Sequence, residues 1–421
     1  MPVYLIATLD TKGDEAEFVR SRLVALGVPT VLMDAGCLGT SSVAPGIPRD
    51  AVFEAAGAAL ADVQAANDRG RAVTLAATGA ANIVRATYDH GDLSGVIAIG
   101  GSAGTTIGTT AMRALPLGVP KLCVSTVAAG NMRPYVGGKD VMTMYSVVDI
   151  AGLNRISRTV LDQAARAMAG MVALPKAPAV STDRPLVAAT MFGVTTPCVQ
   201  HARGILEAAG YEVLVFHATG SGGEAMESLI ADGLIAGVLD ITTTELADEL
   251  VGGVLTAGPT RLTAAGKRGV PQVISVGALD MVNFGPPETV PTQFRDRLLY
   301  RHNPTITLMR TTVAENRALG EEIGRKAAAA TGPTAILLPK QGVSAIDKTG
   351  QPFNDPSSRD ALFAGIRSSR GSVAVTELNN HINDADFAAA CAQRLLVMLA
   401  KSQGGPSLRV PPATNFSDHS Q

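Results

Sequence analysis

The sequence contains no tryptophan, few aromatic residues and few charged ones. Of its 421 residues, 4% are aromatic and 17% are charged, whereas 46% are hydrophobic and Gly and Ala are abundant. This composition is typical of tightly packed α/β layers. A chain of this length exceeds one ordinary hydrophobic core, so we expect two domains of about 150 to 200 residues each.

The sequence also lacks an excess of either charge and a long hydrophobic run. The formal net charge of −2 and the pI near 6.3 give no general attraction to nucleic acid or to anionic lipid. No basic segment precedes an apolar run at the N-terminus, and no run reaches the roughly eighteen apolar residues that a membrane span needs. We therefore expect a cytoplasmic protein without nucleic-acid or membrane partners.

Cysteine is scarce, and its spacing excludes the common metal motifs. The four cysteines lie far apart without a C-x-x-C pair: Cys37, Cys123, Cys198 and Cys391. This spacing favours buried, reduced thiols in a cytoplasm over disulfides or zinc, with a reactive thiol as the alternative.

The first half alternates strand-like and helix-like segments. Asp14 and Glu17 are spaced to cap the first helix, and further helices are predicted over 50–66, 103–115 and about 154–171. The stretch 69–90 is compatible with a strand and a Gly turn or with a long helix that contains Gly79, and we favour the helix. The predicted strands are VYLIATL, PTVLMDAG, GVIAIGG and PKLCVST. Such alternation predicts right-handed crossovers and a mostly parallel sheet.

A Pro-rich segment, LPKAPAVSTDRP, separates this half from a second alternating half. Strands predicted there include PLVAATMFG, YEVLVFHATG, AGVLDITT, PQVISVGALD, TITLMRTT, TAILLPKQG and SVAVTELNN. The predicted fold class is α/β, with two Rossmann-like doubly wound domains that have mostly parallel sheets. We place a nucleotide-binding domain at 1–178, a second domain on the substrate or partner side at 179–403, and a flexible tail at 404–421.

The strongest candidate for a ligand site is the turn in GVIAIGGSAGTTIG, because ligands of open parallel sheets bind at the carboxyl ends of strands. Its glycines let the backbone approach a ligand, its hydroxyls can donate, and the following helix offers free N–H groups to an anion. The candidate phosphate-binding residues are Gly100, Gly101, Ser102, Gly104 and Thr105. The alternative is a tight turn whose glycines serve packing alone.

The opening stretch LDTKGDE places polar residues directly after the first predicted strand. Lys12 can reach phosphate oxygens, Thr11 can donate a hydroxyl, and Asp10 can hold Mg²⁺. Alternatively, Asp10 caps the following helix and Lys12 is merely solvated. The opening stretch and the Gly-rich turn support each other if their strands are neighbours in the sheet.

Two more strand ends of the first half carry polar residues. Ser125, Thr126 and Gly130 begin a long loop, CVSTVAAGNMRPYVGGKD, which suits a cover for a base or ribose, or a subunit contact. Asp34 ends the second strand, where it is a candidate for capping or for a ribose contact.

Polar residues also end the strands of the second half. They are suited to binding a small polar substrate or to acid–base chemistry. The candidates are His217, Asp240, Thr242, Lys340, Gln341 and His381, with further polar residues at Glu245, Asp280, Asn283 and 302–303. No metal-ligand spacing and no G-x-S-x-G elbow is present, and each residue also has an ordinary structural explanation.

Together the motifs LIATLDTKGDE, GVIAIGGSAGTT, LCVSTVAAGNMRPYVG and LLPKQGVSAIDKTGQPFNDP identify a family resemblance. From Val3 to about Ala400 the chain resembles the Tm-one-like ATP-binding domain family, bacterial and plant proteins related to the N-terminal region of tomato mosaic virus resistance protein. The resemblance implies two Rossmann-like domains, dimer formation, and ATP bound mainly by the N-terminal domain. The ATP-binding residues that it implies are Asp10, Thr11, Lys12, Gly100, Gly101, Ser102, Gly104, Thr105, Ser125, Thr126 and Gly130.

Three functions are compatible with these patterns. The first is an ATP-dependent enzyme that holds Mg-ATP on the N-terminal domain and a small polar metabolite in the interdomain cleft. The second is a non-catalytic, ATP-responsive dimeric binding or regulatory protein. The third is a lyase or isomerase whose Gly-rich turn holds the phosphate of its own substrate. The sequence does not determine whether ATP is hydrolysed.

Overall fold

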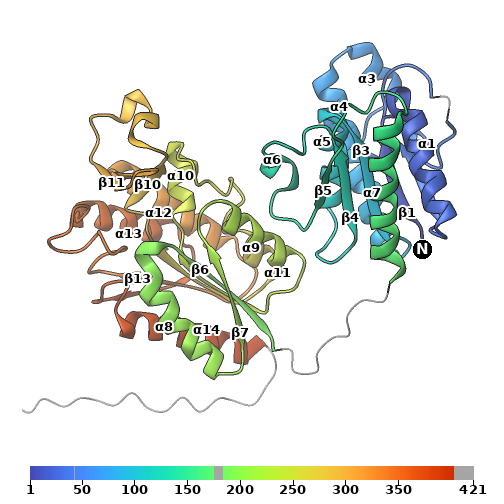
Figure 1. Cartoon of the computed structure of the whole chain (residues 1–421). Helices are drawn as coiled ribbons and strands as arrows, with labels where there is room; N and C mark the ends of the chain where they lie inside the picture. Colours follow the sequence, from blue (N-terminus) through green and yellow to red (C-terminus); the bar gives the residue numbers. More distant parts are fainter. Residues whose placement is uncertain (42, 175–183, 403–421) are drawn as a thin grey trace, which may run out of the picture. The chain divides into compact units, whose positions relative to one another are not determined.

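The structure, a computed structural model, describes residues 1–41, 43–174 and 184–402. The chain divides into two compact units, Met1–Val180 and Ser181–Gln421. Each unit contains a parallel sheet flanked by helices (Figure 1), which confirms the predicted fold class. Most of the predicted Pro-rich linker and the predicted tail lie outside the described residues.

The N-terminal unit has a five-stranded sheet in which every neighbouring pair is parallel. From edge to edge its strands are β2 (Thr30–Asp34), β1 (Val3–Ala7), β3 (Gly95–Gly100), β4 (Lys121–Ser125) and β5 (Met142–Tyr145). All residues of β3 and β4 are buried, as expected for central parallel strands that are covered on both faces.

Helices cover both faces of this sheet. The helices are α1 (Leu9–Ala25), α2 (Arg49–Ala55), α3 (Leu60–Ala66), α4 (Arg69–Asp89), α5 (Ser102–Arg113), α6 (Arg133–Val136) and α7 (Arg155–Ala173). Helices α1 and α7 lie side by side on one face (Figure 1) and form one hydrophobic core, whereas α2 to α5 form the core of the other face. Helix α5 packs closely on β3, because an added Cβ on Gly108 would lie 2.2 Å from the Cβ of Ala98.

The C-terminal unit has a six-stranded parallel sheet. Its strands, in spatial order, are β14 (Ala374–Leu378), β13 (Thr334–Pro339), β9 (Gln272–Gly277), β8 (Gly237–Thr242), β6 (Leu186–Met191) and β7 (Glu212–His217). Its helices are α8 (Thr196–Ala208), α9 (Ser221–Ala231), α10 (Glu245–Val251), α11 (Ala264–Arg268), α12 (Val313–Ala328), α13 (Pro356–Ser369) and α14 (Ala385–Ser402), with 3₁₀ turns at Gly193–Thr195, Pro287–Thr289 and Thr292–Phe294.

A separate antiparallel sheet corrects one sequence-based expectation. The predicted strand TITLMRTT does not join the parallel sheet. It forms β12 (Ile306–Arg310), which pairs with β10 (Met281–Phe284) and β11 (Leu299–Asn303). The sequence pattern does not distinguish the two cases, because a short buried strand has the same composition in either sheet.

Two further helix predictions differ in outcome. The predicted helix over 69–90 is confirmed as α4. The predicted helix over 50–66 is wrong, because Gly57 adopts a positive φ of 75° and separates α2 from α3.

The cysteines are not paired among the described residues. Cys123, Cys198 and Cys391 are buried and Cys37 is half-buried. Burial raises the pKa of both Cys123 and Cys198 to about 12, so these thiols stay protonated at neutral pH. None of the described helices is long and apolar enough to cross a membrane.

Candidate functional site

Three of the predicted motifs end three adjacent strands of the N-terminal sheet. Strand β1 pairs with β3 along Val3–Ile6, and β3 pairs with β4. The chain runs from β1 outward to β2 on one side and then returns to β3 on the other side. Such a reversal of strand order leaves a crevice at the carboxyl ends of the two central strands, where ligands of doubly wound sheets bind. The opening stretch and the Gly-rich turn lie on either side of this reversal.

The Gly-rich turn presents free backbone donors at the start of α5. Gly101 is the N-cap residue, and no side chain caps the helix. The first amide that finds a partner is that of Thr105, which donates to the Gly101 carbonyl at 2.8 Å. Among the described residues nothing accepts from the amides of Ser102, Ala103 and Gly104. Three free amides and the positive end of the helix dipole favour an anion at this position.

The glycines of this turn serve two different purposes. An added Cβ on Gly100 would lie 2.9 Å from the Gly104 Cα, and one on Gly104 would lie 3.0 Å from the Ile99 carbonyl oxygen. These two glycines are needed for packing of α5 on β3. In contrast, the nearest atom to an added Cβ on Gly101 is Thr126 Oγ1 at 3.7 Å, an ordinary contact. Packing within the described structure does not require glycine at position 101.

Two of the hydroxyl-bearing residues near the turn are buried, and two are accessible to solvent. Thr105 and Ser125 are fully buried, and their hydroxyl oxygens lie 2.6 Å apart. The Ser125 oxygen also accepts from the Val127 amide at 3.1 Å. These two side chains hold the turns after β3 and β4 together. Ser102 is exposed and Thr126 is half-buried, so these two residues are the more accessible hydroxyl-bearing residues.

Gly130 lies farther along the loop that follows β4. It is exposed, and its amide donates to the Val127 carbonyl at 3.0 Å. The structure therefore places Gly130 in a surface turn, apart from the buried contacts between Thr105 and Ser125.

The opening stretch is helical, which corrects the expected cap at Asp14. Helix α1 begins at Leu9, because the Leu9 amide donates to Asp34 Oδ1 and the Thr11 and Lys12 amides donate to the Thr8 carbonyl. The helix is kinked at Lys12, which has φ −131° and ψ 23°. Lys12 is half-buried, and its side-chain ammonium group makes no hydrogen bond or ion pair among the described residues. Thr11 is exposed and contacts the Thr8 hydroxyl.

Asp10 contacts the loop after β2. Its Oδ2 accepts from the Leu38 amide at 2.7 Å, and an added Cβ on Gly36 would lie 2.7 Å from the carboxyl carbon. Its Oδ1 accepts no hydrogen bond among the described residues. No group of three or more His, Cys, Asp or Glu side chains in the described part of the chain could hold a metal. A metal at Asp10 would therefore need ligands from a bound phosphate or from water.

Asp34 has a structural role. It is 2% exposed, and its Oδ1 accepts from the Leu9 and Gly36 amides. Its Oδ2 pairs with Arg49 at 2.8 Å, and Arg49 also donates to the carbonyl of Leu38. Asp34 thus fixes the turns after β1 and β2, as a capping residue does, and both its oxygens are already used.

Asp240 in the C-terminal unit is held in a buried ionic network. Arg261 is fully buried, and its guanidinium contacts both oxygens of Asp240 at 2.5 and 2.7 Å and Glu245 Oε2 at 2.7 Å. Burial raises the pKa of Glu245, and Arg261 opposes this effect. The Thr242 hydroxyl bonds to that of Thr195 at 2.8 Å. Sequence reasoning missed Arg261, since no motif marks a residue whose partners lie in three other segments.

The other predicted substrate residues do not converge. His217 ends the edge strand β7 and stacks on Phe192 with 5.5 Å between ring centroids. At the other side of the sheet, Gln341 bonds to Asn379 at 2.8 Å. Lys340 is exposed, and the 302–303 pair lies in the antiparallel strand β11.

His381 follows β14 and lies near Gln341, whose amide donates to the carbonyl of the preceding residue, Asn380. Its Nε2 donates to the Ser344 carbonyl at 2.8 Å, and its Nδ1 accepts from the Asn383 amide. His381 thus connects the end of β14 to the loop after β13.

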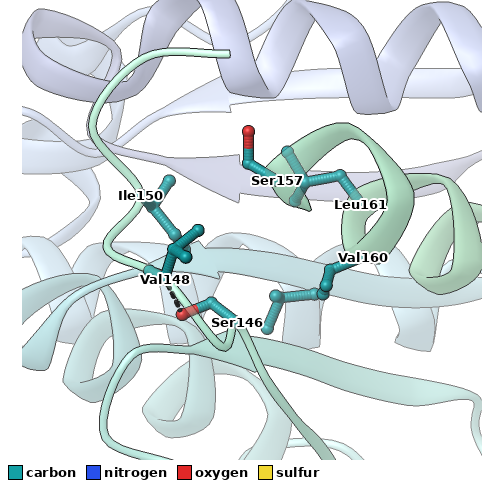
Figure 2. A pocket seen from close by; sticks show the side chains of 7 residues that line it. Ser146, Val148, Ile150, Ser157, Val160 and Leu161 are labelled. Atoms are coloured by element: carbon teal, nitrogen blue, oxygen red, sulfur yellow. Dashed lines mark hydrogen bonds between the residues drawn. The ribbon is translucent and has the colours of Figure 1, made fainter. Parts of the chain in front are cut away.

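A small hollow between β4, the segment after β5 and α7 is not a candidate ligand site. Figure 2 shows its lining, which is apolar except for two serine hydroxyls. One of them, Ser146 Oγ, donates to the Val148 carbonyl at 2.6 Å. The hollow leaves no room for a water molecule, so it is a packing feature.

Comparison with known proteins gives one family over both units. The family model for the N-terminal domain of the uncharacterised protein family UPF0261 matches residues 1–177, and that for its C-terminal domain matches residues 184–399. A UPF0261 protein from Clostridium tetani is 49% identical over 401 residues, which cover 95% of this chain and 99% of the relative.

A plant protein and a solved structure were also matched. The tomato mosaic virus (ToMV) resistance protein Tm-1(GCR237) from Solanum lycopersicum is 40% identical over 428 residues, which cover 95% of this chain and 56% of the tomato protein. A thioesterase domain from the curacin biosynthetic pathway aligns over 51% of this chain and 92% of its own, with 13% identity and a TM-score of 0.25, which supports no inference.

Proposed function

The chain belongs to the uncharacterised protein family UPF0261, and from this membership and the geometry above we propose that its N-terminal unit binds ATP. The observation that carries the proposal is the pairing of β1 with β3. It brings the free amides of α5 and the unpaired Lys12 to the two sides of the strand-order reversal. A helix N-terminus and a lysine are the two groups that hold phosphates in many nucleotide sites.

In this proposal the phosphates accept hydrogen bonds from the amides of Ser102, Ala103 and Gly104. Gly101 lets the backbone approach the phosphate oxygens, and Lys12 supplies a positive charge. Thr105 and Ser125 act indirectly, because their hydroxyls bond to each other and keep the turns in place. Thr126 and Ser102 are the hydroxyls suited to direct contact.

Mg²⁺ fits this arrangement through Asp10. Its Oδ1 has no partner among the described residues, and a carboxylate with phosphate oxygens is the ligand set that Mg²⁺ takes in nucleotide sites. The bound ion would neutralise phosphate charge. Thr11 is exposed in the same helical turn, and in this proposal its hydroxyl contacts the bound nucleotide or its water shell.

Equilibrium dialysis with labelled ATP, with and without Mg²⁺, tests this function. We expect saturable binding by the full chain that Mg²⁺ strengthens, and absence of binding would refute the proposal. Chromatography of the same samples separates two uses of the nucleotide. Formation of ADP, enhanced by a small polar metabolite, supports an ATP-dependent enzyme, whereas intact ATP throughout supports a nucleotide-responsive binding protein.

We propose in addition that the chain forms a homodimer. The support is β5, an edge strand that pairs with β4 on one side and with no strand of the described residues on the other. Three apolar side chains are exposed on or next to it: Met142 (47%), Tyr145 (44%) and Val147 (57%). Exposed edges of this kind pair with another chain unless they are protected. Sedimentation of the wild type and of a Met142→Lys/Tyr145→Lys variant tests the proposal. A monomeric wild type would contradict it.

A further inference from the structure

Asp280 in the C-terminal unit has a buried oxygen without a partner. Asp280 follows β9, a central strand of the parallel sheet, and is 1% exposed. Its Oδ2 accepts from Ser344 Oγ at 2.7 Å. Its Oδ1 is buried and bonds to no group of the described residues. A buried acceptor without a donor loses its hydrogen bond to water without replacement, so this position favours a donor from outside the chain.

The nearby arginines do not serve this oxygen. Arg359 contacts Asp347 Oδ1 at 2.6 Å, and Arg310 Nη2 lies 3.8 Å from the same oxygen. Arg310 directs its other donors to carbonyl oxygens, including those of Asp280 and Phe353. No ion pair joins either arginine to the Asp280 carboxyl group within the described structure. The two guanidinium groups therefore face the carboxylate of Asp347 and not that of Asp280.

Burial, followed by repulsion from Asp347, raises the pKa of Asp280 to about 7. The charge of Arg310 and the hydrogen bond from Ser344 lower the pKa of Asp280, but they do not offset this rise.

The group lies close beneath the face formed by the carboxyl ends of the strands. Ser344 is fully buried, but the next residue, Ala345, is exposed, and its amide donates to the Val194 carbonyl at 3.0 Å. His381 is half-buried and donates to the Ser344 carbonyl. Loops after β6, β13 and β14 thus meet at this place. Ligands of open parallel sheets bind at this face.

We propose that Asp280, Ser344 and His381 mark a second ligand site, which takes a small molecule through a hydroxyl or ammonium group that donates to Asp280 Oδ1. The site is chemically distinct from the phosphate site of the N-terminal unit, because above about pH 7 its free group is a charged acceptor that repels anions. It therefore selects donor-bearing ligands and excludes phosphates.

Saturation-transfer NMR with the full chain at about pH 8, where Asp280 is deprotonated, tests this proposal with three probes. Glycerol offers hydroxyl donors, ethylamine offers an ammonium group, and acetate offers an acceptor alone. The test variant is Asp280→Asn, which keeps the shape of the side chain. Ser344 Oγ donates to Asp280 Oδ2, so in the variant the amide oxygen takes this position and accepts the same hydrogen bond. The NH₂ group then takes the position of Oδ1, where a donor replaces the free acceptor. The matched control is Thr307→Val, which removes another buried oxygen without a partner.

We expect saturation transfer to glycerol or ethylamine in the wild type and in Thr307→Val, at least fivefold weaker transfer in Asp280→Asn, and none to acetate. The donor probe that shows the stronger saturation transfer identifies the ligand class as hydroxyl or ammonium. Absence of transfer in the wild type, equal transfer in Asp280→Asn, or transfer to acetate would each overturn the proposal. A crystal structure with a single water at Oδ1 in the presence of all three probes would overturn it as well.

Discussion

Gly100 and Gly104 approach each other so closely that an added Cβ on Gly100 would lie 2.9 Å from the Gly104 Cα. The intervening Gly101 has no such constraint, since its nearest neighbour would lie at 3.7 Å. Packing therefore requires glycine at positions 100 and 104, whereas position 101 is free to serve ligand binding.

The first prediction compares Gly101 with Gly100. Gly101→Ala should leave the free energy of unfolding within about 0.5 kcal/mol of the wild type, as for an unstrained surface change. It should weaken ATP binding at least tenfold, because the methyl group blocks the approach of a phosphate. Gly100→Ala should lower stability by about 1–3 kcal/mol through overpacking. Urea unfolding and a nucleotide-binding assay of both variants give the comparison. Unchanged ATP binding by Gly101→Ala would show that the phosphate lies elsewhere.

The second prediction concerns Lys12. Hydrogen bonds to charged groups contribute about 1.5–3 kcal/mol, so Lys12→Gln should weaken ATP binding by about ten- to a hundredfold without loss of stability. The expected loss is smaller at high salt, because ions screen the lysine charge. Lys340→Gln, an exposed lysine of the C-terminal unit, is the control and should bind ATP as the wild type does. Equal affinities of the two variants would contradict the assignment of Lys12.

The third prediction concerns Arg261. Arg261→Met leaves Asp240 and Glu245 buried without their cation, and removal of one partner from a buried ion pair costs about 3–5 kcal/mol. Arg203→Met, which breaks an exposed pair with Glu207, should cost less than about 0.5 kcal/mol. Urea unfolding measures both. A loss below about 1 kcal/mol for Arg261→Met would mean that the network does not stabilise the C-terminal unit.

The fourth prediction is a pH dependence that arises from Asp280. Its pKa rises from an ordinary 3.8 to about 7 on folding, through burial and repulsion from Asp347, with Arg310 opposing the rise. Between these two values the folded chain binds a proton that the unfolded chain does not, so this group reduces stability as the pH rises. Asp280→Asn removes the effect.

The measurement is urea unfolding at about pH 5 and about pH 8, on either side of the upper value. The gain in stability of Asp280→Asn over the wild type should be larger at the higher pH. Asp360→Asn, an exposed position, should show no such trend. A gain that is independent of pH would mean that Asp280 does not take up a proton on folding.

The sequence predicted the fold class and the two series of alternating elements, because buried parallel strands and Gly-rich turns leave local patterns. The runs around Gly100 and the helix 69–90 are examples. The order of the strands is not local information, and so the pairing of β1 with β3, on which the candidate site depends, required the structure. The antiparallel position of β12 was missed for the same reason.

The candidate sites were predictable to different degrees. The Gly-rich turn combines sequence signals within a few residues, and the structure adds which glycine is free of packing. The roles of the phosphate-site residues stay predictions. In the C-terminal unit, Asp240 was found as a strand end, but its partner Arg261 lies 21 residues away in the sequence and in no motif. Partners brought together by tertiary packing leave no local pattern that spacing rules can detect.

The most direct test of the central claim is a calorimetric titration of ATP, with and without Mg²⁺, into the wild type and a Lys12→Gln/Gly101→Ala double variant. The account predicts one ATP per chain, tighter binding with Mg²⁺, and no measurable binding by the folded double variant. Absence of binding by the wild type, or equal binding by the double variant, would contradict a phosphate site at the carboxyl ends of β1 and β3.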